Sequence, residues 1–372
     1  RPAAVGAPKS TYLGDTPRAR GVSVPVGSLW FVRPKNLREF GDEEMEALAA
    51  EVKKREIPGL ALGGYSSDSA AQISVAGLAA LKDLTHLKYL ELRNCSAVSD
   101  RSLNQLAGLK NLRYLDLEQL IFPRHADISA KGLRHLADLD NLVWLNLRGC
   151  RVGDDGLAAL PELRSLRSVN LEYNDQFSVR GIAHLVDVPE LRQLDLSGNR
   201  GITDEALPHL AKMTKLEELD IGRTDIKGEK LDALGTLRNL RALSLQNLRL
   251  KGEYLAKLEK LTSLESLDLS RRSKQSFWNL QPKDLEALQK LRGLKRLTLN
   301  HRPVTDEALA ALVPLPKLEY LDLQHCEQIT DAGLRQIKKM TALRRVLLYG
   351  TNVSFTGKRA LEKARPLLKV SR

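Results

Sequence analysis

Two histidines, His301 and His325, are placed where this chain could do metal or phosphate chemistry. They lie 24 residues apart and take the same position in two consecutive segments of similar sequence. If neighbouring strands carry them, their rings would approach to about 5 Å, close enough to share a metal ion or a phosphate. Two ligands without a third make a poor metal site. The sequence therefore predicts a pair of exposed histidines and no bound metal.

The three cysteines also share one position. Cys95, Cys150 and Cys326 each come three residues after a Leu-x-Leu segment, in LELRNC, LNLRGC and LDLQHC. On stacked strands the closest pair would lie two repeats apart, roughly 10 Å, which is beyond the ~7 Å that a disulfide spans. We expect buried, free thiols in a turn and no redox chemistry.

Carboxylates recur in the middle of the same segments, where a pair could act as general acid and base. Each belongs to a Leu-Asp-Leu or similar triplet, which favours a consensus role, with neutralisation by nearby Lys and Arg. The carboxylates are those of Glu91, Asp116, Asp195, Asp220, Asp268 and Asp322. Two residues further along, the side-chain charge at one repeat position alternates in sign over four successive repeats. This alternation predicts a ladder of ion pairs between Arg93, Glu118, Arg148 and Glu172.

Known catalytic motifs are missing from the chain. It has no G-x-x-x-x-G-K-[ST], G-x-G-x-x-G after a strand, H-E-x-x-H or G-x-S-x-G. The sequence therefore predicts no enzyme, no catalytic residue and no cofactor.

A repeat explains why these residues share positions. The pattern L-x-x-L-x-L recurs at spacings of 24, 25 or 30 residues, and its twelve first residues are Ile57, Leu87, Leu112, Leu142, Leu166, Leu191, Leu216, Leu240, Leu264, Leu294, Leu318 and Leu343. Its alternation indicates a short strand with one buried face. A helix start follows, as at Thr203, a natural N-cap, and the spacing of Leu207, Leu210 and Met213 is helical.

Stacked units of this kind form a parallel sheet with helices outside. Packed helices are about 10 Å apart and strands about 4.8 Å, so the stack must bend with its strands on the concave side. The sequence resembles the leucine-rich-repeat family over about residues 57–370. Three of its segments are similar to the cysteine-containing subclass of that family, which is found in F-box receptors and planctomycete-like bacterial proteins: "ITDEAL" (202–207), "VTDEAL" (304–309) and "ITDAGL" (329–334). The resemblance implies an α/β horseshoe solenoid of about twelve repeats and a protein-interaction role.

The ends depart from the repeat. Residues 1–26 have little periodicity and predict an extended arm without an F-box-like helical segment. We expect an N-terminal cap over 27–56, repeats over 57–350 and a basic C-terminal cap over 351–372. The N-terminal cap combines a strand at Gly27–Arg33 with a helix at Asp42–Arg55 that buries Met45, Leu48 and Val52, and the C-terminal end forms a last helix and a short strand within Val353–Val370.

Two features are candidates for binding a partner. Aromatic side chains take the same outward position in three consecutive repeats, which suits either stacking within the sheet or a hot spot. Longer repeats place inserts on one rim, at Gln119–Ala126 and Ser270–Pro282, where recognition residues or a rim plug would lie. The candidate partner-binding residues are Tyr89, Tyr114, Trp144, Tyr173, Arg271, Arg272, Phe277, Trp278, His301 and Arg302.

Charge leaves alternatives open. The net charge is +12, and residues 333–372 hold eleven Lys or Arg against Glu362 alone. This end would suit a solvated cap or a binder of nucleic acid or an anionic surface. No aromatic-and-basic nucleic-acid motif accompanies it, so we favour a monomeric protein-binding module. A scaffold or substrate-receptor subunit of a larger complex is the other alternative.

The compartment is weakly defined by the sequence. No apolar run reaches the roughly 20 residues of a membrane span, and no signal-peptide pattern begins the chain. These features favour the cytoplasm. Because the first residue is Arg1, removal of an upstream segment stays open.

Overall fold

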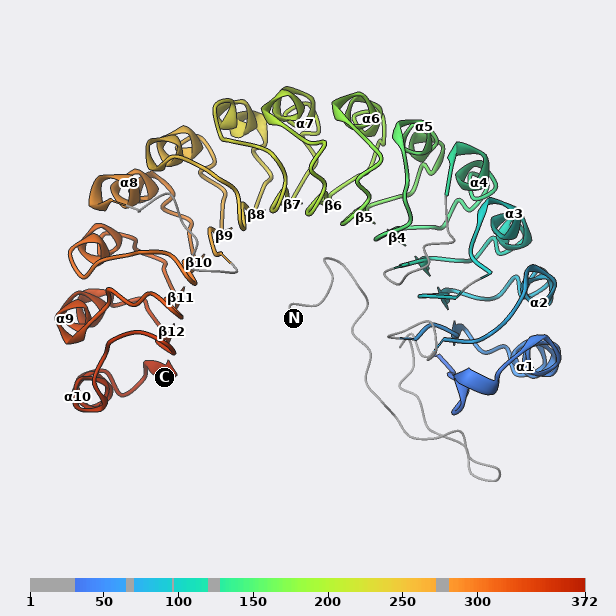
Figure 1. Ribbon diagram of the computed structural model, residues 1–372, viewed down its shortest axis with the longest axis horizontal. Helices are drawn as coiled ribbons and strands as arrows, with labels where there is room; N and C mark the ends of the chain where they lie inside the picture. Colours follow the sequence, from blue (N-terminus) through green and yellow to red (C-terminus); the bar gives the residue numbers. More distant parts are fainter. Residues whose placement is uncertain (1–30, 65–69, 96, 120–127, 272–280, 372) are drawn as a thin grey trace. The chain divides into compact units, whose positions relative to one another are not determined.

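The computed structural model describes residues 31–64, 70–95, 97–119, 128–271 and 281–371. The chain divides into two units, unit 1 (Arg1–Asp195) and unit 2 (Leu196–Arg372), and each is described by itself. In both units short parallel strands follow one another in sequence order, and helical segments cover one side of them (Figure 1). Residues 1–30 and the inserts at 120–127 and 272–280 lie outside the described residues.

Unit 1 has three-residue strands that alternate with short helices. Its strands are β1 (Gly59–Ala61), β2 (Tyr89–Glu91), β3 (Tyr114–Asp116), β4 (Trp144–Asn146), β5 (Ser168–Asn170) and β6 (Gln193–Asp195). Its helices are η1 (Leu37–Glu39), α1 (Asp42–Lys54), α2 (Val75–Ala79), α3 (Asp100–Leu103), η3 (Asn104–Leu106), α4 (Ala130–Arg134), α5 (Asp154–Leu157), η4 (Leu160–Glu162) and α6 (Val179–Leu185).

Unit 2 continues the same pattern with more 3-10 turns. Its strands are β7 (Glu218–Asp220), β8 (Ala242–Ser244), β9 (Ser266–Asp268), β10 (Arg296–Thr298), β11 (Tyr320–Asp322), β12 (Arg345–Leu347) and β13 (Lys369–Ser371). Its helices are η5 (Asp204–Ala206), α7 (Leu207–Leu210), η6 (Leu231–Thr236), η7 (Gly252–Leu258), α8 (Pro282–Glu286), η8 (Ala287–Lys290), η9 (Ala308–Leu312), α9 (Asp331–Lys339) and α10 (Phe355–Ala364).

The predicted parallel repeat fold is confirmed, and so is its register. The middle residue of every strand is apolar and faces the core; Leu90, Leu145 and Leu297, for example, have no exposed surface. Neighbouring strands pair middle to middle, as Leu90 with Leu115 and Leu297 with Leu321. Because side chains alternate along a strand, the first and third residues must face the other way. We call that surface of each unit its strand face.

A buried turn column follows the strands and holds the cysteines, as predicted. The thiols of Cys95, Cys150 and Cys326 donate to the carbonyls of Leu62, Leu117 and Leu299 in the preceding repeat, at 3.4, 3.0 and 3.2 Å. All three cysteines are free and buried. The thiol adds a second hydrogen bond to such a carbonyl, since those of Leu62 and Leu299 also accept from the backbone N of Ala71 and Arg302.

Aspartates join each helix start to the next one. Oδ1 of Asp154 accepts from the backbone N of Ser178 at 2.7 Å, and Oδ2 accepts from its Oγ at 2.9 Å. The same arrangement links Asp42 to Ser74, Asp100 to Ser129, Asp306 to Thr330 and Asp331 to Ser354. Three residues after Ser178, Gly181 leaves room for the carboxylate, since a Cβ there would lie 2.5 Å from Asp154 Oδ1.

Both ends of the described chain are closed by helices. At the N-terminal end, α1 buries Met45, Ala49 and Val52, whereas Leu48, predicted on the same face, is half-buried. At the other end, α10 and β13 confirm the predicted last helix and strand. After α10, Arg365 donates to four carbonyls of the preceding repeat, those of Lys338, Met340, Thr341 and Leu343.

Several repeats of unit 2 form their helical segment as a 3-10 helix and not as an α-helix. The segment after "VTDEAL" forms η9, and "ITDEAL" begins with η5 before α7. One or two turns are too short to gain much from α-helical hydrogen bonds, and 3-10 turns are common in such short segments.

Candidate functional site

The strand face of unit 1 carries the predicted aromatic row. Tyr89, Tyr114 and Trp144 are in register on β2, β3 and β4. Tyr89 stacks on Phe31 with ring centroids 5.1 Å apart and is 9% exposed, and Trp144 is 3% exposed. Tyr114 is half-buried, and Arg113 lies 6.0 Å from its ring. The structure therefore brings the three side chains together but leaves Tyr114 as the most exposed of them.

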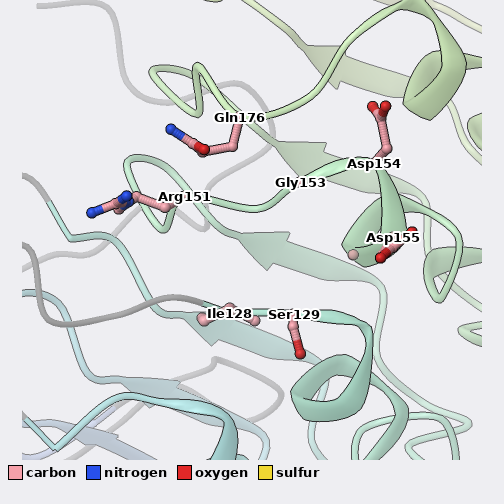
Figure 2. A pocket seen from close by; sticks show the side chains of 8 residues that line it. Ile128, Ser129, Arg151, Gly153, Asp154, Asp155 and Gln176 are labelled. Carbon is pink, nitrogen blue, oxygen red and sulfur yellow. The ribbon is translucent and has the colours of Figure 1, made fainter.

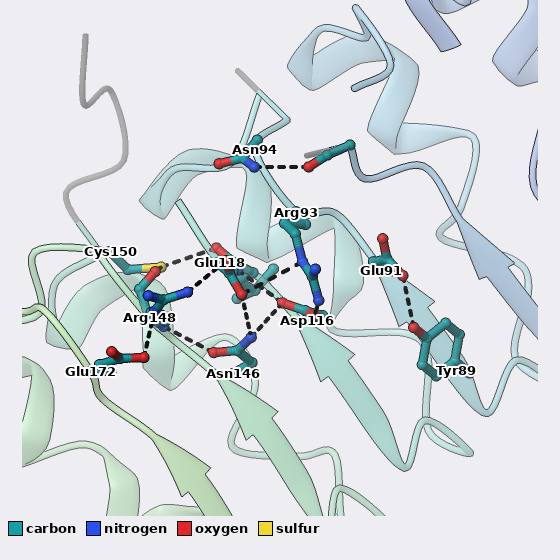
Figure 3. Close-up of polar contacts among 12 residues, drawn as sticks. Tyr89, Glu91, Arg93, Asn94, Asp116, Glu118, Asn146, Arg148, Cys150 and Glu172 are labelled. Atoms are coloured by element: carbon teal, nitrogen blue, oxygen red, sulfur yellow. Dashed lines mark hydrogen bonds and ion pairs between the residues drawn. The ribbon is translucent and has the colours of Figure 1, made fainter. Parts of the chain in front are cut away.

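An ion-pair network fixes the same face, as the alternating column predicted (Figure 3). Arg93 lies 2.8 Å from Asp116 and 3.6 Å from Glu118. Arg148 lies 3.3 Å from Glu118 and 2.6 Å from Glu172. The side chains of both arginines are less than a third exposed, so this network is more buried than a surface ladder would be. Buried, mutually paired charges hold a surface in one arrangement.

The carboxylates of this network are occupied by structural contacts. Asn146 Nδ2 donates to Asp116 at 2.9 Å and to Glu118 at 3.2 Å. Glu91 accepts from Tyr89 Oη at 2.9 Å and pairs with Arg33 at 2.6 Å. Burial raises the pKa of Asp116 to about 6, although Arg93 opposes this shift. The contacts support the consensus role predicted for these carboxylates.

Tyr173 occupies a different environment from the aromatic row. It follows β5 in a left-handed conformation, with φ 57°, and the guanidinium of Arg148 lies 5.2 Å from its ring centroid. Tyr173 therefore extends the Arg148–Glu172 end of the network and is half-buried.

The turn edge of unit 2 brings together several other candidates. We use this name for the residues four positions after each middle strand residue, directly before the turn column, together with Tyr349, which packs on this edge: Arg271, His301, His325 and Gly350. The rings of His301 and His325 are stacked, with centroids 4.2 Å apart and planes 2° apart, which confirms the predicted proximity. Both histidines are half-buried, so the expectation of exposed side chains was wrong. Tyr349 meets His325 edge-on at 5.2 Å and is 60% exposed. A Cβ on Gly350 would collide with the His325 ring.

Arg302 and Arg271 lie close to this edge. Arg302 occupies the turn-column position that Cys326 takes in the next repeat, is 1% exposed, and donates through Nε to the carbonyl of Leu269. Its burial, and secondarily Arg271, lower the pKa of the Arg302 guanidinium. Arg271 is half-buried, and its Nη1 atom is enclosed without a hydrogen bond among the described residues. Burial and the nearby Arg249 lower the pKa of Arg271.

The remaining candidates, Arg272, Phe277 and Trp278, lie outside the described residues. They belong to the predicted insert at Ser270–Pro282, of which residues 272–280 lie outside the described part of the chain. Its residues stay predictions from the sequence.

Two shallow hollows are lined by polar residues. One, of about 290 Å³, lies between Ile128, Ser129, Arg151, Asp154, Asp155 and Gln176 (Figure 2). Its Asp154 is already bound to Ser178 and Gly181, so that carboxylate serves the fold. The other, of about 340 Å³ in unit 2, is lined mainly by cations and amides: Arg238, Asn239, Arg241, Lys295 and Lys317, with Glu265.

Metal ligands do not gather in the part of the chain that is described. Among these residues no three His, Cys, Asp or Glu side chains lie together as a metal site would need. Nor does any described helix have the length and apolar character to cross a bilayer.

A cationic row on the strand face of unit 2 was missed from the sequence. The first residues of β10, β11, β12 and β13 are Arg296, Tyr320, Arg345 and Lys369. They are in register from strand to strand. The repeat alignment places all four in the column of Tyr89 and Trp144, so the same reasoning that found the aromatic row could have found this one.

Comparisons with known proteins agree on the architecture. A family model described as "Leucine Rich repeat" matches residues 141–160, 190–207 and 315–337. No curated protein matches the chain.

Several solved structures are similar in fold. In the Rad7 and Elc1 complex of yeast, a chain is 20% identical, with 88% of this chain and 87% of that chain covered and a TM-score of 0.53. A TDR receptor is 18% identical over 85% of this chain and 51% of its own, with a TM-score of 0.52. The internalin InlF of Listeria monocytogenes is 18% identical over 89% and 93%, with a TM-score of 0.50. At these identities the likeness shows the fold alone.

Proposed function

Because this chain is a leucine-rich-repeat protein, we propose that it is a non-enzymatic module that binds a protein partner on its strand face and on the turn edge of unit 2. The repeat fold supplies an extended surface of short strands whose outward residues are free to vary, since the core needs only the leucines. Such surfaces suit recognition of another macromolecule and offer no enclosed site for a small substrate.

The observation that carries the proposal is the turn edge of unit 2. Arg271, His301 and Tyr349 present one guanidinium and two rings on backbone that the strands hold in place. Arginine and tyrosine are the side chains that most often dominate binding energy in protein interfaces. Arg271 is half-buried, and a partner carboxylate or carbonyl would give its guanidinium a charge-assisted hydrogen bond.

The strand face of unit 1 supports the same function in a second way. Its ion pairs fix the side chains around Tyr114 before any partner arrives, so little conformational entropy is lost there on binding. Tyr89 and Trp144 flank Tyr114 in register on the neighbouring strands, and both are buried.

A subunit of a larger complex is the second candidate. The yeast Rad7 structure was obtained as a complex with Elc1, which is an observation about that protein. For this chain, stable association with a partner through the N-terminal cap around α1 would favour this role over a module that binds transiently through its strand face.

The test is capture of partners by the whole chain with chemical crosslinking, followed by affinity measurements with variants. Arg271→Ala and Trp278→Ala should each weaken partner binding by roughly 30-fold, the factor that corresponds to a hot spot of about 2 kcal/mol. Their melting temperatures should stay near that of the wild type. Arg335→Ala, an exposed arginine on α9, is the matched control and should bind normally.

Two outcomes would contradict the proposal. Unchanged affinity in both variants, with the melting temperature lowered, would mean that these residues only pack the rim. Catalytic turnover by the purified protein, or a stoichiometric metal that is lost in the His301→Ala, His325→Ala double variant, would overturn the non-enzymatic assignment.

A further inference from the structure

Cations on the strand face of unit 2 lack the carboxylate partners that cations on the unit 1 face have. In unit 1, Arg33, Arg93 and Arg148 each lie within 3.6 Å of at least one carboxylate. In unit 2, the described residues provide no ion pair for Arg296, Arg345 or Lys369, although their neighbour Lys295 pairs with Glu265 at 2.9 Å. The side chains of all three unpaired cations are exposed.

These cations form one row across four strands, the cationic row. Arg296 is the Cα partner of Tyr320, Tyr320 of Arg345, and Arg345 of Lys369. Neighbouring strands are about 4.8 Å apart, so Arg345 and Lys369 bring two like charges side by side. Like charges directly opposite on adjacent strands destabilise a sheet. The fold gains nothing from this arrangement, whereas an anionic ligand would relieve the repulsion.

Tyr320 holds part of the row in position. The guanidinium carbon of Arg296 lies 4.3 Å from the centroid of the Tyr320 ring. A guanidinium stacked on a ring keeps its in-plane N–H groups available for a carboxylate. Arg296 is therefore held beside Tyr320 before a ligand binds.

The surroundings of the row select the kind of anion. The third strand positions hold the carboxylates of Asp268 on β9 and Asp322 on β11. A phosphodiester chain carries its charges fixed in the backbone and would meet these carboxylates, whereas the carboxylates of a peptide are on flexible side chains that can turn toward the row and away from Asp268 and Asp322. On β12 and in the turn after it the neighbours are apolar or aromatic: Leu347 is half-buried, and Tyr349 is 60% exposed.

We infer that the cationic row binds an acidic peptide segment of a partner protein, with carboxylates on Arg296, Arg345 and Lys369 and an apolar side chain against Leu347 and Tyr349. The inference rests on the proposed function and names the chemistry of its partner. The cationic lining of the nearby hollow, with Arg241, Lys295 and Lys317, would extend the same preference beyond the row.

The test uses the full chain and three fluorescent probes: octaglutamate, the same peptide with one central Glu replaced by Phe, and octathymidylate. Binding is measured by fluorescence anisotropy over a range of salt concentrations. The double variant Arg345→Gln/Lys369→Gln should weaken both peptides at least tenfold. The control Arg335→Gln/Lys338→Gln removes the same charge from exposed positions on α9 and should change affinity less than twofold.

Two further readouts separate a binding row from a structural one. The row variant should melt at the same temperature as the wild type or higher, because a repulsion has been removed, whereas a structural role would lower the melting temperature. Tyr349→Ala should weaken the Phe-containing peptide and leave octaglutamate unchanged.

Several outcomes would overturn the inference. These are equal losses in the row and control variants, failure of both peptides to bind, and tighter binding of octathymidylate through the same residues. If a captured protein partner binds the row variant normally, the inference fails while the proposed function stands. If the peptides need the row but no protein partner depends on either surface, the proposed function fails instead.

Discussion

Asp154 accepts two hydrogen bonds from Ser178, one from its backbone N and one from its hydroxyl, and so ties the helix start of one repeat to that of the next. Ser178 in turn caps α6, since its Oγ accepts from the backbone N of Arg180 at 3.2 Å. A capping residue is thereby held by the preceding repeat. This linkage couples neighbouring repeats outside their strands and their leucine core.

Replacing Gly181 tests this linkage. A Cβ in Gly181→Ala would lie 2.5 Å from Asp154 Oδ1 and 2.9 Å from Leu157 Cδ1, so the repeats must separate or the carboxylate must leave. We expect a loss of about 1–3 kcal/mol in the free energy of unfolding, measured with denaturant. In an Asp154→Ala background the same substitution should cost clearly less. Equal costs in both backgrounds would refute the collision with the carboxylate.

The buried carboxylate of Asp116 predicts a pH dependence. Its folded pKa of about 6 lies above the unfolded value, so the folded state takes up the proton first and stability is lost as pH rises from about 4 through 6. Asp116→Asn removes this dependence. Between pH 4 and pH 7.5 the free energy of unfolding of the variant should therefore rise relative to that of the wild type, by up to about 3 kcal/mol.

Asp232 provides a control of opposite sign. Its hydrogen bond from Lys257 lowers its pKa. Asp232→Asn should therefore lose stability relative to the wild type as pH rises through the acid range. The same sign of change for both variants in pH-dependent unfolding would contradict the assignment for Asp116.

Thiol reactivity tests the turn column. Burial raises the pKa of Cys95 and Cys326 to about 12 and raises that of Cys150 as well. Native protein should react slowly with a thiol reagent, and denatured protein should titrate three thiols. Cys150→Ser should lower stability by about 1 kcal/mol. An intramolecular disulfide would be incompatible with the repeat register.

The closing contact of Arg365 is expected to contribute measurable stability. Its guanidinium donates to four carbonyls at 3.0–3.1 Å. Arg365→Ala leaves these acceptors without that donor and should lower the free energy of unfolding by roughly 2 kcal/mol. Amide hydrogens in β12 and β13 should also exchange faster. Lys363→Ala, an exposed change on α10, should have little effect. Equal exchange rates in the two variants would show that the cap holds without Arg365.

The spacing of leucines was enough to predict the strands, their register and the shared columns. Once the register is set, Arg93, Glu118 and Arg148 must lie side by side just after the strands of successive repeats, and so must His301 and His325. The link from Asp154 to Ser178 was also readable, because a Ser or Thr followed by Gly three residues later recurs one repeat after an Asp.

Other features depend on contacts that the repeat does not encode. Tyr89 shares the column of Tyr114 but is covered by Phe31, from a segment outside the repeat. Arg302 was interpreted as a contact residue because of its type, yet its position equals that of Cys326, and position decides burial. The choice between α and 3-10 turns depends on small differences over four to seven residues.

The last strand has a consequence for behaviour at high concentration. β13 is three residues long and pairs with β12 on one side, and the described residues place no strand on its other side. An unpaired strand edge of this kind is a template for pairing with another chain. Lys369 is exposed on this strand. Arg365, between α10 and β13, is hydrogen-bonded to carbonyls of the preceding repeat. A short, positively charged edge repels an identical edge. Lys369, which completes the cationic row, therefore also disfavours pairing between the β13 strands of two copies of the chain.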